Sequence, residues 1–114
     1  MSHSVLLQLA RDSIQEVLEA KNTIDKNALI QQHPLLLQTI PTTFTLFLEG
    51  ELRGQNTQKD LPLADAIIIS SKKAAFEDEQ HPPITTSEYL SCEIELTLHT
   101  NDGVMSERDK PILD

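Results

Sequence analysis

The chain has 114 residues, a length typical of one domain, and its 18 acidic against 9 basic side chains give a formal net charge of −9. This balance argues against binding to nucleic acids or to anionic membranes, because both need clustered lysine and arginine. With Cys92 as its single cysteine the chain can form no internal disulfide, and its first residues lack the pattern of a signal peptide. We therefore expect a cytoplasmic protein.

Two helices are predicted in the first third of the chain. Residues 4–20 form an amphipathic pattern with Ser4 as N-cap, and the apolar positions recur every three or four residues at Leu6, Leu7, Ala10, Ile14, Val17 and Leu18. A shorter helix is expected over residues 26–32, ended by Pro34. The apolar run 35–37 is expected to be a buried connector or an irregular strand.

A β-hairpin is predicted next. Residues 42–49 alternate strictly, with Phe44, Leu46 and Leu48 on the side of the core, and residues 52–57 form the return strand. A three-residue loop, 49–51, pairs Leu48 with Leu52 and buries both, whereas a two-residue loop sets an apolar residue against a charged one. We therefore predict the three-residue loop.

In this register Arg53 and Gln55 face outward beside Phe47 and Thr45, while Gly54 faces the core. A guanidinium over an aromatic ring can bind an anion or a carboxylate. We therefore predict a ligand-binding site formed by Phe47, Arg53, Gly54 and Gln55.

Two alternatives stay open for this site. Arg53 can instead pair with a neighbouring acid, such as Glu49, Glu51 or Glu95, and serve only to keep the sheet soluble. The strand glycine, Gly54, indicates a β-bulge or a close approach, either of a packed helix or of a ligand.

The second half of the chain predicts a helix over residues 62–76, a capping box at Thr85 and Glu88, and a strand over residues 91–99. The side chains that this strand directs inward are Cys92, Ile94, Leu96 and Leu98. The fold class expected from this order is α+β, a small antiparallel sheet with helices packed on one face in two layers. We expect residues 1–100 to form the domain and residues 101–114 to be a polar, loose tail.

Three groups of side chains suggest a chemistry but also have a plainer interpretation. Glu77, Asp78 and Glu79 with His81 suggest a metal site, but no second group is spaced to complete a ligand shell, so a solvated helix end is expected. Glu93 and Glu95 share a strand face without an evident cleft. Cys92 alternates into the core and is expected to be an inert thiol. We predict neither a metal nor a cofactor.

Two segments, LEGELRGQNT and LPLADAIIISSKKAAFEDEQHPPITTSEYL, resemble the signature region of the AMMECR family. This family contains the AMME-syndrome candidate protein of animals and protein A of the prokaryotic AmmeMemoRadiSam system. The matching positions are Gly50, Leu52–Arg53–Gly54, Ala74–Ala75, Asp78 and Pro83–Ile84–Thr85. The chain departs from the family pattern at Gln55–Asn56–Thr57, which replaces C-I-G, and at Gln80–His81, which replaces R-F.

The resemblance implies an AMMECR-like α+β domain that is shortened at its C-terminus, with an outer sheet face that is exposed or shared with a partner. Gln55 stands where the family has cysteine, so thiolate chemistry is not expected there. The function expected is a non-enzymatic accessory or interaction module that binds a protein partner or associates with itself. As an alternative, the resemblance implies a component of a modification or redox pathway that involves a Memo-like and a radical-SAM protein, and a degenerate copy of low activity is a third interpretation.

Overall fold

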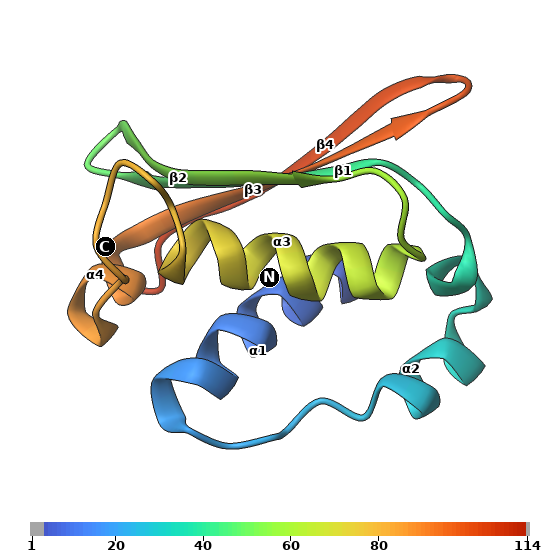
Figure 1. The fold of residues 1–114 in the computed structure, drawn as a ribbon, viewed down its shortest axis with the longest axis horizontal. Helices are drawn as coiled ribbons and strands as arrows, with labels where there is room; N and C mark the ends of the chain where they lie inside the picture. Colours follow the sequence, from blue (N-terminus) through green and yellow to red (C-terminus); the bar gives the residue numbers. More distant parts are fainter. Residues whose placement is uncertain (1–3, 114) are drawn as a thin grey trace.

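Four antiparallel strands form one sheet, with the helices against one of its faces, in a computed structural model that describes residues 4–113 (Figure 1). The strand order is β2-β1-β3-β4. The elements are α1 (Val5–Glu19), α2 (Lys26–Gln32), the 3-10 turn η1 (Pro34–Leu37), β1 (Thr42–Leu48), β2 (Glu51–Gln58), α3 (Leu63–Phe76), α4 (Thr86–Ser91), β3 (Cys92–Thr100) and β4 (Gly103–Asp109). The predicted fold class, α+β in two layers, is confirmed.

The predicted helices form with the expected caps. The Ser4 side chain accepts a hydrogen bond from the Leu7 amide at 3.1 Å, and α1 ends at Ala20 in a left-handed conformation. Helix α2 has the predicted bounds, and its N-cap Asp25 accepts a hydrogen bond from Ala28. The capping box of α4 is also present, because the side chain of Thr85 and that of Glu88 each accept the other's backbone amide.

Helix α3 is the main cover of the sheet, since it packs against β1, β2 and α1. Its buried face combines small and apolar side chains, namely Leu63, Ala64, Ala66, Ile67, Ser70, Ser71, Ala74 and Ala75. The small residues let the helix axis lie close to the sheet. Burial of these side chains with the inward residues of β1 and β3 forms one continuous core.

The hairpin between β1 and β2 has a different register from the predicted one. Its loop has two residues, Glu49 and Gly50, both with positive φ, and Leu52 lies opposite Phe47 rather than Leu48. Arg53 is a bulged residue without an opposite partner, so Gly54 still pairs with Leu46. The extra residue is the reason that the sequence pattern misled, because a bulge turns the alternation of a strand over by one position.

Two further expectations are wrong. The run 35–37 forms the turn η1, in which only Leu36 is buried. Residues 101–114 are not a loose tail throughout, because β4 pairs with β3 along its whole length. Strand β3 is therefore central rather than an edge, and it buries Cys92, Ile94, Leu96 and Leu98 as predicted.

Figure 1 shows the arrangement that results from this topology. Helices α1 and α3 lie beneath the middle of the sheet, and the β3–β4 hairpin extends past them. No helix of residues 4–113 is long and apolar enough to cross a membrane.

Candidate functional site

Arg53, predicted to face outward, lies inside the protein. Its side chain is 5% exposed, it donates a hydrogen bond to the Pro82 carbonyl at 2.7 Å, and it lies 3.4 Å from the Glu88 carboxylate. The Thr85 amide, and then the Arg53 guanidinium, hold the pKa of Glu88 below its usual value. Arg53 thus connects β2 with the segment that leads into α4. The alternative that Arg53 pairs with an acid is right in kind, but the partner is Glu88.

Leu52, predicted to be buried, is 53% exposed. It takes the outward position that Arg53 was expected to hold. The predicted guanidinium over Phe47 is present, but it belongs to Arg108 of β4, whose guanidinium carbon lies 4.7 Å from the ring centre. Sequence reasoning missed Arg108 because the strand that carries it was predicted to be a loose tail.

Arg108 already has anionic partners on the outer sheet face. Its guanidinium lies 2.9 Å from Glu95 and 3.2 Å from Glu93. The two glutamates therefore neutralise the cation beside Phe47. Because both carboxylates bind Arg108, they are not available as the acid and base of a catalytic pair.

Gly54 faces the helix layer, as predicted. A Cβ atom at this position would overlap the carbonyl oxygen of Ala74 in α3. The absence of a side chain therefore serves the contact between β2 and α3. Two of the interpretations of this glycine are confirmed together, since the bulge lies at the neighbouring Arg53 and helix α3 approaches Gly54 closely.

Gln55 faces outward beside Thr45, also as predicted, and its amide donates a hydrogen bond to the Thr45 hydroxyl at 2.9 Å. It lines a polar cavity of about 420 Å³, together with Asn56, Lys73 and residues 77–80. The four predicted site residues thus separate into Phe47 on the outer face, Arg53 and Gly54 inside, and Gln55 at this cavity. Ligand binding by any of them stays a prediction.

Asp78 holds the loop after α3 against β2. Its carboxylate accepts hydrogen bonds from the amides of Gln80 and Gln55, at 3.1 and 3.5 Å, and lies 2.9 Å from the His81 ring. The hydrogen bond with His81 is the main cause that lowers the pKa of Asp78 below its usual value. Within residues 4–113 no three His, Cys, Asp or Glu side chains form a group that could hold a metal ion.

Cys92 is buried, as predicted, at the start of β3 opposite Leu48. Burial raises the pKa of its thiol to about 11. The thiol is therefore protonated at neutral pH, and a protonated, enclosed thiol is a poor nucleophile.

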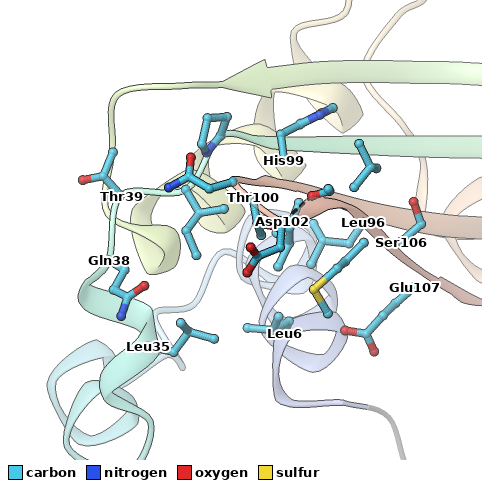
Figure 2. A pocket seen from close by; sticks show the side chains of 17 residues that line it. Leu6, Leu35, Gln38, Thr39, Leu96, His99, Thr100, Asp102, Ser106 and Glu107 are labelled. Atoms are coloured by element: carbon cyan, nitrogen blue, oxygen red, sulfur yellow. Dashed lines mark hydrogen bonds between the residues drawn. The ribbon is translucent and has the colours of Figure 1, made fainter.

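An open groove lies beneath the free end of the β3–β4 hairpin, and its volume is about 620 Å³ (Figure 2). We call it the hairpin groove. It is lined by the hairpin residues 98–107, by Leu96, by Leu6 of α1 and by Leu35 and residues 38–41 around η1. Sequence reasoning missed it because its wall comes from three distant parts of the chain, one of which was predicted to be unstructured.

The floor of the hairpin groove is apolar and its charged groups are acidic. Figure 2 shows the side chains of Leu6, Leu35 and Leu96 around the groove, with those of Asp102 and Glu107 beside them. Met105, which faces the same side from β4, is 62% exposed. The residues lining the groove include neither lysine nor arginine.

The sequence profile of the AMMECR1 family matches residues 7–110 of the chain. This match covers the sheet, helices α2 to α4, α1 except its first two residues, and the lining of both cavities except Leu6. The chain belongs to the AMMECR1 family.

A solved structure agrees with this assignment. The uncharacterized AMMECR1-family protein PH0010 from Pyrococcus horikoshii is 25% identical in sequence and superposes with a TM-score of 0.71 over 82% of this chain. The superposed part is 48% of the PH0010 chain, so this chain spans about half the length of that AMMECR1 protein. No curated protein matches the sequence.

The residues of the AMMECR1 signature join three elements of the fold. Its Leu-Arg-Gly segment is the bulge of β2, where Arg53 binds Glu88 and Gly54 admits α3. Its aspartate, Asp78, accepts a hydrogen bond from the Gln55 amide and so links the loop after α3 to β2. In this AMMECR1 chain the signature residues therefore join β2, α3 and α4, and Gln55 stands at their solvent-exposed border.

Proposed function

We propose that this AMMECR1-family chain is a non-enzymatic protein-interaction module that docks its partner at β4 and the hairpin groove. The observation that carries the proposal is the concentration of exposed apolar surface at this end of the sheet. Val104 and Met105 of β4 are 65% and 62% exposed, and Leu35 across the groove is 48% exposed. Contiguous apolar surface beside a groove is typical of a docking site for another protein.

The position of β4 at the edge of the sheet supports the same function. Strand β4 pairs with β3 on one side, and within residues 4–113 no strand pairs with its other side. The backbone groups on that side are available to a partner, which gives a second means of attachment next to the apolar groove.

The lack of an accessible cysteine supports a module that catalyses no reaction of its own. Gln55 replaces the cysteine of the family pattern, and a carboxamide neither attacks a carbonyl nor binds a soft metal well. The remaining thiol, Cys92, is enclosed in the core. A module with a reduced, buried thiol suits the cytoplasm, which we propose as its location.

The first partners to test are a Memo-like protein and a radical-SAM protein, which the family resemblance implies. Each would be taken from the same genome and mixed with the full chain, and complex formation would be measured by size-exclusion chromatography with light scattering. Wild-type protein should form a complex with at least one of them.

The variant that tests the docking site is Met105→Asp, which places a charge in the groove. It should abolish the complex, whereas Leu52→Asp, at a position of comparable exposure (53% against 62%) on the opposite edge strand, should not. A complex that tolerates Met105→Asp and fails with Leu52→Asp would contradict the proposed site. The absence of a complex with both proteins would remove them as partners.

A further inference from the structure

The side chains that border the hairpin groove indicate the chemistry of a partner that could bind there. The side chains of β4 alternate, and the register with β3 places Met105 beside Leu98 and Glu107 beside Leu96 on the helix side of the sheet. An apolar group and a carboxylate thus follow each other along the face of β4 that borders the groove.

Two acidic groups of the groove have no counter-charge. Asp102 is exposed and Glu107 is half-buried, and neither forms a hydrogen bond or an ion pair through its side chain with another residue of the described chain, 4–113. A half-buried carboxylate next to leucines loses part of its hydration without recovering it from a partner. A cation brought by an occupant would restore this interaction.

Asp109, the next acidic residue on this face of β4, differs from Glu107 because it has a basic partner. Asp109 is bound by Arg11 at 2.9 Å, and Arg11 also donates to the Lys110 carbonyl. The end of β4 that is covered by α1 is therefore neutralised from within the chain, while the end that borders the groove is not. The unmatched negative charge is confined to the part of β4 that is open to a partner.

We infer that the hairpin groove binds an extended segment of a protein partner, which adds to β4 as a further strand and presents an apolar and a basic side chain to the groove. This inference rests on the proposed function and names the chemistry of the partner. The basic side chain pairs with Glu107, and the apolar one packs beside Met105 over Leu6 and Leu35. Strand addition satisfies the outer backbone groups of β4 and sets the two side chains at the spacing of alternate residues.

The outward positions of β4 carry no unmatched charge. Arg108 is bound by Glu93 and Glu95, the Ser106 hydroxyl is 3.1 Å from that of Thr97, and Val104 is an exposed apolar side chain. The outward side chains of the added strand are therefore expected to be uncharged.

The test uses three capped peptides of seven residues and the full chain. The first alternates threonine, at the outward positions, with valine and lysine at the inward ones. The second replaces each lysine by glutamate, and the third repeats the first with N-methyl groups on alternate backbone amides. Binding is measured by fluorescence anisotropy.

The lysine peptide should bind, and both other peptides should bind at least about tenfold more weakly, which corresponds to the loss of one charge pair or of the backbone ladder. The variant Glu107→Gln should weaken the lysine peptide by about five- to tenfold. Glu51→Gln removes the same charge from the exposed edge strand β2 and should leave the affinity unchanged.

Each outcome has a definite consequence. Equal binding of the lysine and glutamate peptides, or equal effects of Glu107→Gln and Glu51→Gln, would overturn the basic character of the partner. Binding of the N-methylated peptide would overturn strand addition. Absence of binding by every peptide would overturn this inference, and the proposed function would still stand if Met105→Asp abolishes a protein complex.

Discussion

Arg53 and Gly54 are neighbours in the sequence, and the bulge in β2 gives each a structural task. Arg53 joins β2 to α4 through Glu88, and Gly54 leaves room for the Ala74 carbonyl of α3. The residues on either side of this pair, Leu52 and Gln55, are exposed. The buried, structural part of this segment is therefore the pair Arg53–Gly54 alone.

Gly54→Ala tests the close approach of α3. The added methyl group overlaps a backbone oxygen that cannot move without shifting the helix, so we expect a loss of about 1–3 kcal/mol in the free energy of unfolding. Urea denaturation followed by circular dichroism measures it. Leu52→Ala on the same strand, at an exposed position, is the control and should change stability by about 0.5 kcal/mol or less. Equal effects of the two variants would contradict the packing role of Gly54.

Gln55→Cys tests the exposure of the family's cysteine position. The new thiol should react rapidly with a disulfide reagent at pH 7, while wild-type protein should label slowly, because Cys92 is buried with its pKa raised to about 11. Native wild-type protein that labels as fast as unfolded protein would show that Cys92 is accessible. The variant loses the hydrogen bond from the Gln55 amide to the Thr45 hydroxyl, so its free energy of unfolding should fall by about 1 kcal/mol or less.

At the scale of elements, the loop after α3 is fastened to β2 by one side chain. Asp78 accepts two backbone amides and contacts His81, and these interactions favour its ionised form. The border of the polar cavity beside Gln55 therefore depends on the charge of Asp78. A change of pH therefore acts on the contact between β2 and the loop after α3.

The pH dependence of this link has a definite sign. Because the pKa of Asp78 is lowered on folding, its stabilisation is present above the unfolded pKa of 3.8 and is lost as the pH falls through the folded pKa. Asp78→Asn should therefore cost about 1 kcal/mol at pH 6, and this difference from wild type should shrink as the pH falls below the unfolded value and Asp78 becomes protonated. Urea titrations of both proteins across this range provide the measurement. A difference that stays constant with pH would exclude the charge of Asp78 as its cause.

At the scale of the whole molecule, the net charge of −9 separates two kinds of association. A complex with a basic partner is held partly by opposite charges, whereas association of two copies brings like charges together. Salt screens both effects and so acts in opposite directions on the two complexes.

We therefore expect added salt to weaken the complex with a partner and, if copies of the chain associate, to strengthen that association. Light scattering of the chain alone and of the mixture, over a salt series, tests both. A homodimer that strengthens with salt and is lost in Met105→Asp would show that a second copy occupies the hairpin groove. That result would replace the basic partner with self-association.

The sequence by itself determined the elements whose signals are local. The cap at Ser4, the capping box at Thr85 and Glu88, and the alternation that buries Cys92 all depend on residues within a few positions of one another, and each prediction is confirmed. The family signature likewise allowed the correct family and fold class to be inferred from short segments. Helix existence and strand alternation follow from these local patterns because the periods of helix and strand differ.

Only the tertiary structure decided the rest. A single bulged residue turned Arg53 inward and Leu52 outward. The alternation of apolar and polar residues in β2 does not by itself reveal the extra residue. Strand β4 has a single large apolar side chain on each face, Val104 and Met105, and is otherwise polar. It forms because β3 offers it a ladder of backbone hydrogen bonds, since its own sequence pattern does not predict a strand. The Phe47–Arg108 contact and the hairpin groove depend on that strand, and both join residues far apart in the chain. Their positions follow from how the elements pack, which no short stretch of sequence encodes.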